Sequence, residues 1–150
     1  MTEPITDVVV LIPGITGSTL ARRRGDQLTK IWNPQVPGIV QALGTLGRSL
    51  DDLRLTGDEV EAVDLVSGIH VIPGLWTVEV GYRRIIDRLF STFHLLEAGH
   101  HAIPNFLRFP YDWRLSNQHN AQMLKKTAEP VLHAWRAQGE PFRDARLVLV

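Results

Sequence analysis

A short glycine-containing loop after the first apolar run holds the residues best suited to chemistry. Val8–Ile12 is β-branched and aliphatic, and it stops at Pro13-Gly14 before a small-residue loop at 15–18. Such a run is typical of a strand buried on both faces in a parallel sheet. Backbone N–H groups just past the end of the strand would suit a developing negative charge, on either an oxyanion or a phosphate.

Three interpretations of this loop stay open on spacing alone: a plain turn, an oxyanion loop or a phosphate loop. Phosphate loops need G-x-x-x-x-G-K-[ST] or G-x-G-x-x-G. Here two residues separate Gly14 from Gly17 and no Lys follows. A nucleotide-binding βαβ enzyme therefore lacks its expected spacing.

A second motif, Phe109–Ser116, places two bulky aromatic residues around Asp112, two positions before Arg114. We expect a packed corner in which the Asp112 carboxylate caps or pairs with a nearby group, Arg114 makes bridging contacts, and the aromatic side chains fill the core. The alternative is a direct catalytic role for Asp112.

A third motif, Ile72–Trp76, is an apolar loop that could line a hydrophobic groove or simply pack. The histidines lack the spacing of metal ligands, so we expect no metal and no cofactor. None of the serines lies in a G-x-S-x-G nucleophile elbow; they are Ser18, Ser49, Ser67, Ser91 and Ser116.

The elements that must position these motifs alternate between strands and helices. Strands are predicted over 8–12, 105–109 and 146–150, and helices over 37–54, over 82–96 with Gly99 placed to end it, and over 117–138 with Pro130 inside. The alternation predicts an α/β fold with a parallel sheet and right-handed crossover helices.

Residues 19–76 are too long for an ordinary connection, and we interpret them as an inserted cap or lid rather than sheet. Within them, 22–26 is expected to be a solvated turn and 31–34 irregular. Residues 59–72 are expected to be extended or a hairpin, with Ser67-Gly68 as its turn.

Composition describes one globular domain and excludes several classes of protein. The 150 residues are 44% hydrophobic and 21% charged, and sixteen basic residues balance sixteen acidic ones. Neutrality argues against nucleic-acid binding, and the absence of cysteine excludes disulfides and a cysteine nucleophile. No apolar run is long enough for a transmembrane segment, and the polar N-terminus is unlike a signal peptide. We therefore expect a cytoplasmic protein.

Four blocks together resemble the lecithin:cholesterol acyltransferase family, in its bacterial lipase/acyltransferase-like branch. They are VVLIPGITGSTL at 9–20, IPGLW at 72–76, GYRRIIDRL at 81–89 and FPYDWRLS at 109–116. The strand RLVLV at 146–150 falls where the family runs into its nucleophile elbow. The resemblance spans nearly the whole chain, and the PYDWRL block is its most specific part.

The resemblance implies a partial α/β-hydrolase fold and a Ser–Asp–His triad that cleaves a lipid or other ester through an acyl-enzyme. Carried onto this sequence, it makes the backbone N–H of Ile15, with Thr16 next, an oxyanion donor. It makes Trp32 and Trp76 substrate contacts in the lid region, and it leaves Asp112 and Arg114 with structural roles.

The family's nucleophile, acid and histidine all lie C-terminal to these blocks. We therefore expect residues 1–150 to be the N-terminal part of one α/β-hydrolase domain, truncated before the nucleophile elbow and inactive alone. The alternative is a non-enzymatic lipid-binding module, or one completed by a second chain that supplies the missing half. An uncovered apolar strand edge would make the chain prone to aggregate.

Overall fold

The computed structural model describes residues 2–32, 60–66, 69–72, 76–78 and 81–150, so the helix expected over 37–54 lies outside the described residues. The chain divides into two compact units. The first contains Met1–Ile12, Arg84–Phe109 and Asn117–Val150, and the second contains Pro13–Arg83 and Pro110–Ser116. Each unit is described by itself below.

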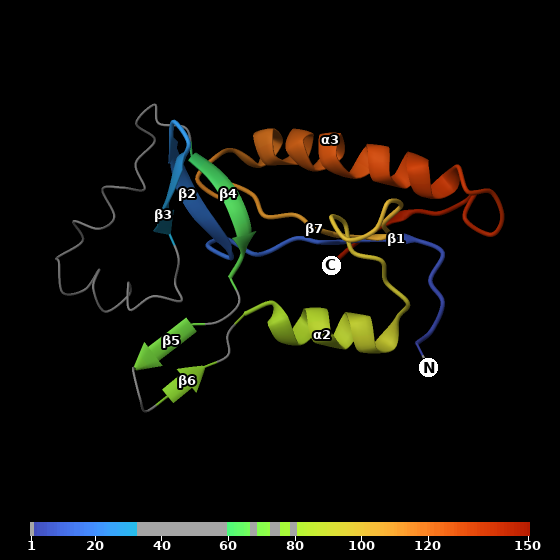
Figure 1. Ribbon diagram of the computed structural model, residues 1–150, viewed down its shortest axis with the longest axis horizontal. Helices are drawn as coiled ribbons and strands as arrows, with labels where there is room; N and C mark the ends of the chain where they lie inside the picture. The colour runs from blue at the N-terminus through green and yellow to red at the C-terminus, as the bar shows by residue number, and fades with distance from the viewer. Residues whose placement is uncertain (1, 33–59, 67–68, 73–75, 79–80) are drawn as a thin grey trace. The chain divides into compact units, whose positions relative to one another are not determined.

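The first unit contains a parallel sheet with its most apolar strand in the middle. Strands β1 (Val8–Leu11), β7 (Phe106–Arg108) and β8 (Leu147–Leu149) are ordered β7-β1-β8, and both pairings are parallel (Figure 1). The four side chains of β1 are at most 2% exposed, as a strand covered on both faces requires. The parallel sheet predicted from the sequence is confirmed.

Two helices cover this sheet, α2 (Arg83–Thr92) on one side and α3 (Asn117–Arg136) on the other (Figure 1). The chain moves from β1 to β7 and then past β1 to β8, so two connections of the same hand place their helices on opposite faces of the sheet. Ala128, Leu132 and Trp135 of α3 are buried at helical spacing, and the Trp135 indole N–H donates to the Thr6 carbonyl at 2.7 Å.

Helix α2 is shorter than the sequence predicts, because it ends at Thr92 and not near Gly99. The Glu3 N–H donates to the Thr92 carbonyl at 2.7 Å, and the His94 N–H donates to the Glu3 carbonyl at 2.8 Å. These two bonds draw the chain into a bridge with the N-terminal segment. Gly99, with a φ of 88°, lies in the turn that follows this bridge.

The second unit contains antiparallel sheet, so the part of the prediction that excluded sheet from residues 19–76 is wrong, whereas their role as a cap or lid stays a prediction. Strands β2 (Ser18–Arg24), β3 (Gln27–Trp32) and β4 (Val60–Leu65) are ordered β3-β2-β4. Strands β5 (Ile69–Ile72) and β6 (Trp76–Val78) pair separately. The extended prediction holds for the described residues 60–65 and 69–72, but β4 and β5 do not form a hairpin, because β4 pairs with β2 and β5 with β6. The predicted turn at Ser67-Gly68 lies outside the described residues.

The β2–β3 connection is a tight hairpin at Gly25-Asp26, and it corrects two further expectations. Gly25 has a φ of 57° and is the first central residue of the two-residue loop, the position that a type II′ turn reserves for glycine. The turn is therefore shorter than predicted, and Arg22–Arg24 belong to strand β2. Ile31 and Trp32, expected to be irregular, lie in β3 because Trp32 pairs with Leu20.

The molecule is thus an α/β protein with a parallel sheet and two separate antiparallel sheets in the described part of the chain. Of the helices found there, none combines the length and apolar character needed to cross a membrane.

Candidate functional site

The loop after β1 is a β-turn over Gly14–Gly17, and it is the center of the candidate site. The Gly17 N–H donates to the Gly14 carbonyl at 2.9 Å, which closes the turn. Thr16, the third residue, has a φ of 67°, whereas Ile15 does not have a positive φ. This is the pattern of a type II turn, in which the third residue must adopt positive φ.

Three hydrogen bonds hold the turn in place from outside. The Gly14 N–H donates to the Tyr82 hydroxyl oxygen at 2.7 Å, and the Trp32 indole N–H donates to the Thr16 carbonyl at 3.0 Å. The Gly17 carbonyl accepts the Val66 N–H at 2.8 Å. Residues distant in sequence therefore fix the turn from both ends.

Gly17 is packed so closely that it must be glycine. A Cβ atom built there would lie 2.6 Å from the Tyr82 hydroxyl oxygen, 2.8 Å from Pro13 Cβ and 2.9 Å from the Gly14 carbonyl oxygen. At Gly14 the nearest atom would be the same hydroxyl oxygen at 3.7 Å, an ordinary contact. The position of Tyr82 therefore depends on the missing side chain at 17.

Thr16 stores backbone strain in the turn. A β-branched residue with positive φ is an outlier, because its side chain crowds the backbone in the left-handed region. Such strain costs on the order of 1 kcal/mol and is concentrated at binding and catalytic sites. The observation directs attention to this turn as a functional element.

The two central amides of the turn, of Ile15 and Thr16, donate to no acceptor in the part of the chain that the structure describes. They are the two amides expected from the sequence as oxyanion donors. The Ile15 side chain is 78% exposed, so an apolar group borders these donors. The arrangement can bind a small anionic oxygen attached to an apolar molecule.

The two tryptophans expected to contact substrate lie in different sheets. Trp32 lies in β3, where its indole donates to the turn and its ring packs edge-on against Trp113, with centroids 5.4 Å apart. Trp76 lies in β6, which pairs with β5. The two tryptophans therefore belong to separately paired strands, and the Trp32 indole lies beside the turn.

Asp112 and Arg114 form a buried ion pair, in keeping with the local pairing expected from the sequence. Arg114 donates from Nε to Asp112 Oδ1 at 2.8 Å and from Nη2 to Oδ2 at 2.6 Å, and both side chains are 7% exposed. The Arg114 N–H also donates to Asp112 Oδ1 at 3.0 Å. This bidentate geometry engages both carboxylate oxygens in shaping the corner.

Ser18, the serine nearest to the turn in sequence, is a structural residue. It is completely buried, and its hydroxyl oxygen accepts the Tyr111 N–H at 3.0 Å, which ties the 110–116 corner to β2. Burial keeps this hydroxyl away from any substrate.

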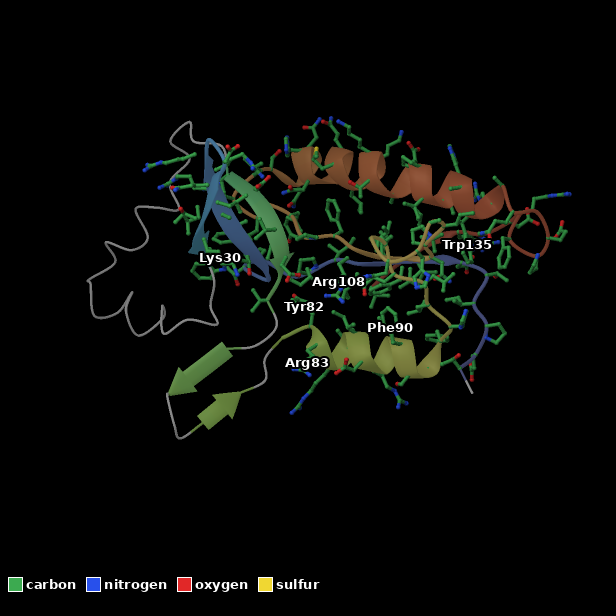
Figure 2. All side chains as sticks on the ribbon, viewed as in Figure 1. Lys30, Tyr82, Arg83, Phe90, Arg108 and Trp135 are labelled. Atoms are coloured by element: carbon green, nitrogen blue, oxygen red, sulfur yellow. The ribbon has the colours of Figure 1, made fainter. Side chains whose placement is uncertain are left out.

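Tyr82 is the site residue that sequence reasoning missed. It immediately precedes Arg83, the first residue of α2, and it is 68 residues from its partner Gly14 (Figure 2). Two sequence signals included it, the predicted helix over 82–96 and the GYRRIIDRL block at 81–89, and neither assigned it a role in the site.

Comparison with known proteins adds no family assignment: neither a family model, nor a curated protein, nor a solved structure matches the chain.

Proposed function

We propose that this chain supplies the oxyanion-binding part of a serine-dependent lipase or O-acyltransferase-like α/β-hydrolase that acts on a lipid or other ester. The observation that carries the proposal is the strained Gly14–Gly17 turn, whose two central amides donate to no acceptor among the described residues. The turn follows the carboxyl end of β1, the strand at which the chain changes direction across the sheet. In open α/β sheets, ligands bind beyond the carboxyl ends of strands at such reversals.

The turn suits one step of acyl transfer. Attack on an ester carbonyl places negative charge on its oxygen, and a fixed N–H aimed at that oxygen stabilises the transition state without reorganisation. The Gly14 amide is occupied by Tyr82, so Ile15 and then Thr16 are the donors. In this proposal the attacking serine, its acid and histidine, and the second oxyanion donor come from residues outside these 150.

The side chains around the turn favour an apolar substrate. Ile15 is largely exposed, and the half-buried Trp32 is bonded to the same turn. An exposed apolar side chain next to hydrogen-bond donors fits an ester whose acyl or alcohol part is a hydrocarbon chain. Such a substrate agrees with a role in lipid metabolism.

The test is Ile15→Pro in the complete reading frame that contains these residues. Proline is common at the second position of a type II turn, so this variant removes the N–H and keeps the turn. We expect a fluorophosphonate probe to label a serine outside the 150 residues. We expect kcat for p-nitrophenyl butyrate to fall about 10²-fold to 10³-fold in the variant.

The isolated 150-residue chain serves as the control and should neither be labelled nor cleave the ester. Labelling of one of its own serines would refute the proposal, as would unchanged kcat in Ile15→Pro. A reading frame without a Ser-x-Gly elbow beyond codon 150 would likewise exclude a single-chain enzyme.

The alternative is a lipid-binding module or one completed by a second chain. A second chain would cover the apolar side chains that β8 and the following residue expose, with Val148, Leu149 and Val150 38%, 56% and 40% exposed; residues of the same chain outside these 150 would cover them equally well. Monodisperse, cooperatively melting 150-residue protein that binds a fluorescent fatty acid would support a lipid-binding module over the enzyme.

A further inference from the structure

We infer that Tyr82 is a third hydrogen-bond donor of the Gly14–Gly17 turn, and that its hydroxyl binds the same anionic oxygen as the Ile15 and Thr16 amides. The inference rests on the proposed function, and it adds a side-chain donor to a site otherwise made of backbone. The first observation is the position of the Tyr82 hydroxyl oxygen, which lies beside both ends of the turn. That oxygen is 2.7 Å from the Gly14 nitrogen and would be 2.6 Å from a Cβ at Gly17.

The hydroxyl has one hydrogen to give. A tyrosine hydroxyl accepts and donates, and here the acceptor function is used by the Gly14 N–H. The hydroxyl hydrogen has no acceptor among the described residues. Accepting a hydrogen bond polarises the O–H group, which makes it a stronger donor to a further acceptor.

The same bond also selects which amides remain available. Because Tyr82 occupies the Gly14 N–H, the amides left for a ligand are those of Ile15 and Thr16, the next two along the chain. The hydroxyl and these two amides therefore border one turn. Tyrosine hydroxyls serve alongside backbone amides in sites that stabilise oxyanions, so this combination fits that chemistry.

The experiment uses the 150-residue chain and diethyl phosphate, a monoanion whose tetrahedral phosphate oxygens stand in for the oxyanion of an acyl-transfer intermediate. Neutral triethyl phosphate is the control probe. Binding is followed by the amide NMR signals of Ile15 and Thr16 and by the ¹³Cζ signal of Tyr82. The chain has only two tyrosines, so Tyr111→Phe is a matched control for Tyr82→Phe.

We expect diethyl phosphate, and not triethyl phosphate, to shift both amides and the Tyr82 ¹³Cζ signal. We expect Tyr82→Phe to weaken binding about 10-fold or more, the loss typical of one hydrogen bond to a charged group, whereas Tyr111→Phe leaves it unchanged. The ¹³Cζ shift needs no variant, so it remains decisive if Tyr82→Phe disturbs the turn.

Other outcomes separate the two proposals. If the amides respond while the Tyr82 ¹³Cζ signal and the affinity of Tyr82→Phe do not change, the role of Tyr82 is overturned and the oxyanion turn stands. If diethyl phosphate shifts neither amide, the anion-binding turn itself is overturned, and the inference about Tyr82 is lost with it.

Discussion

Gly17 is the residue at which the turn tolerates the least change. We expect Gly17→Ala to destabilise the chain by about 1–3 kcal/mol, because two of the atoms that a Cβ would meet are a backbone carbonyl oxygen and a proline carbon that cannot rotate away. Urea unfolding followed by circular dichroism measures the loss. Gly14→Ala is the control and should be nearly neutral, since its Cβ meets only an ordinary contact; equal losses would contradict the packing described here.

Replacing Thr16 should have the opposite effect on stability, because the replacement relieves backbone strain. We expect Thr16→Gly to raise the free energy of unfolding by up to about 0.5 kcal/mol, since the relief of strain at positive φ exceeds the conformational entropy that glycine costs. The same change at Thr29, an exposed residue of the extended strand β3, should lower stability by about 0.5–1 kcal/mol. Two effects of the same sign in urea unfolding would rule out a strained Thr16.

The Asp112–Arg114 pair should matter far more than an ion pair on the surface. Arg114→Met removes the guanidinium that neutralises the buried Asp112 carboxylate, and we expect a loss of about 3 kcal/mol in thermal or urea unfolding. Arg23→Met breaks the pair with Glu61, whose members are each 43% exposed, and should cost about 1 kcal/mol or less. A mild effect at Arg114 would show that water replaces the guanidinium.

At the residue scale, the sequence identified the position of the turn but not what holds it. Pro13-Gly14 after an apolar run indicates a loop, so the amides of Ile15 and Thr16 could be named in advance. Tyr82 could not be named, because its bond to Gly14 spans 68 residues and leaves no local pattern. Site residues recruited from distant elements depend on tertiary packing, which spacing along the chain does not encode.

At the scale of elements, buried apolar strands and periodic helices were predictable, whereas strand pairing was not. The apolar run of β1 and the spacing of Ala128, Leu132 and Trp135 each carry a clear periodic signal. Strand β2 was not predicted, because its three consecutive arginines indicate a solvated turn although the first half of the strand is buried. The early end of α2 depends on Glu3, which no local rule connects to Thr92.

The edge strand β8 supports a prediction about association. Leu149 is 56% exposed on β8, which lies at an edge of the sheet formed by the described residues, so its apolar side chain is available to another strand edge. We expect Leu149→Lys to reduce aggregation in light scattering without a large loss of stability. Met123→Lys adds the same charge at an exposed residue of α3 and should not reduce it; equal effects would point to net charge instead.

At the scale of the whole molecule, balanced charge governs colloidal behaviour. Sixteen basic and sixteen acidic residues cancel, and the isoelectric point of the sequence is about 7.0. We expect solubility in low salt to be lowest near pH 7 and to rise on both sides, because net charge of either sign keeps molecules apart. The solubility can be measured at low salt across pH 5–9, about 2 units on each side of neutrality, from the absorbance that remains in solution after ultracentrifugation. A solubility that falls steadily across that range would contradict the prediction.

The central place of β1 also shapes how the chain is made. The Arg146 N–H donates to the Asp7 carboxylate across 139 residues, so the N-terminal valines gain β8 as a neighbour only after the intervening residues have been made. At usual translation speeds that delay is on the order of 10 s. During this delay a newly made and strongly apolar segment is exposed outside the ribosome. Such a segment is a natural client for chaperones that shield nascent chains.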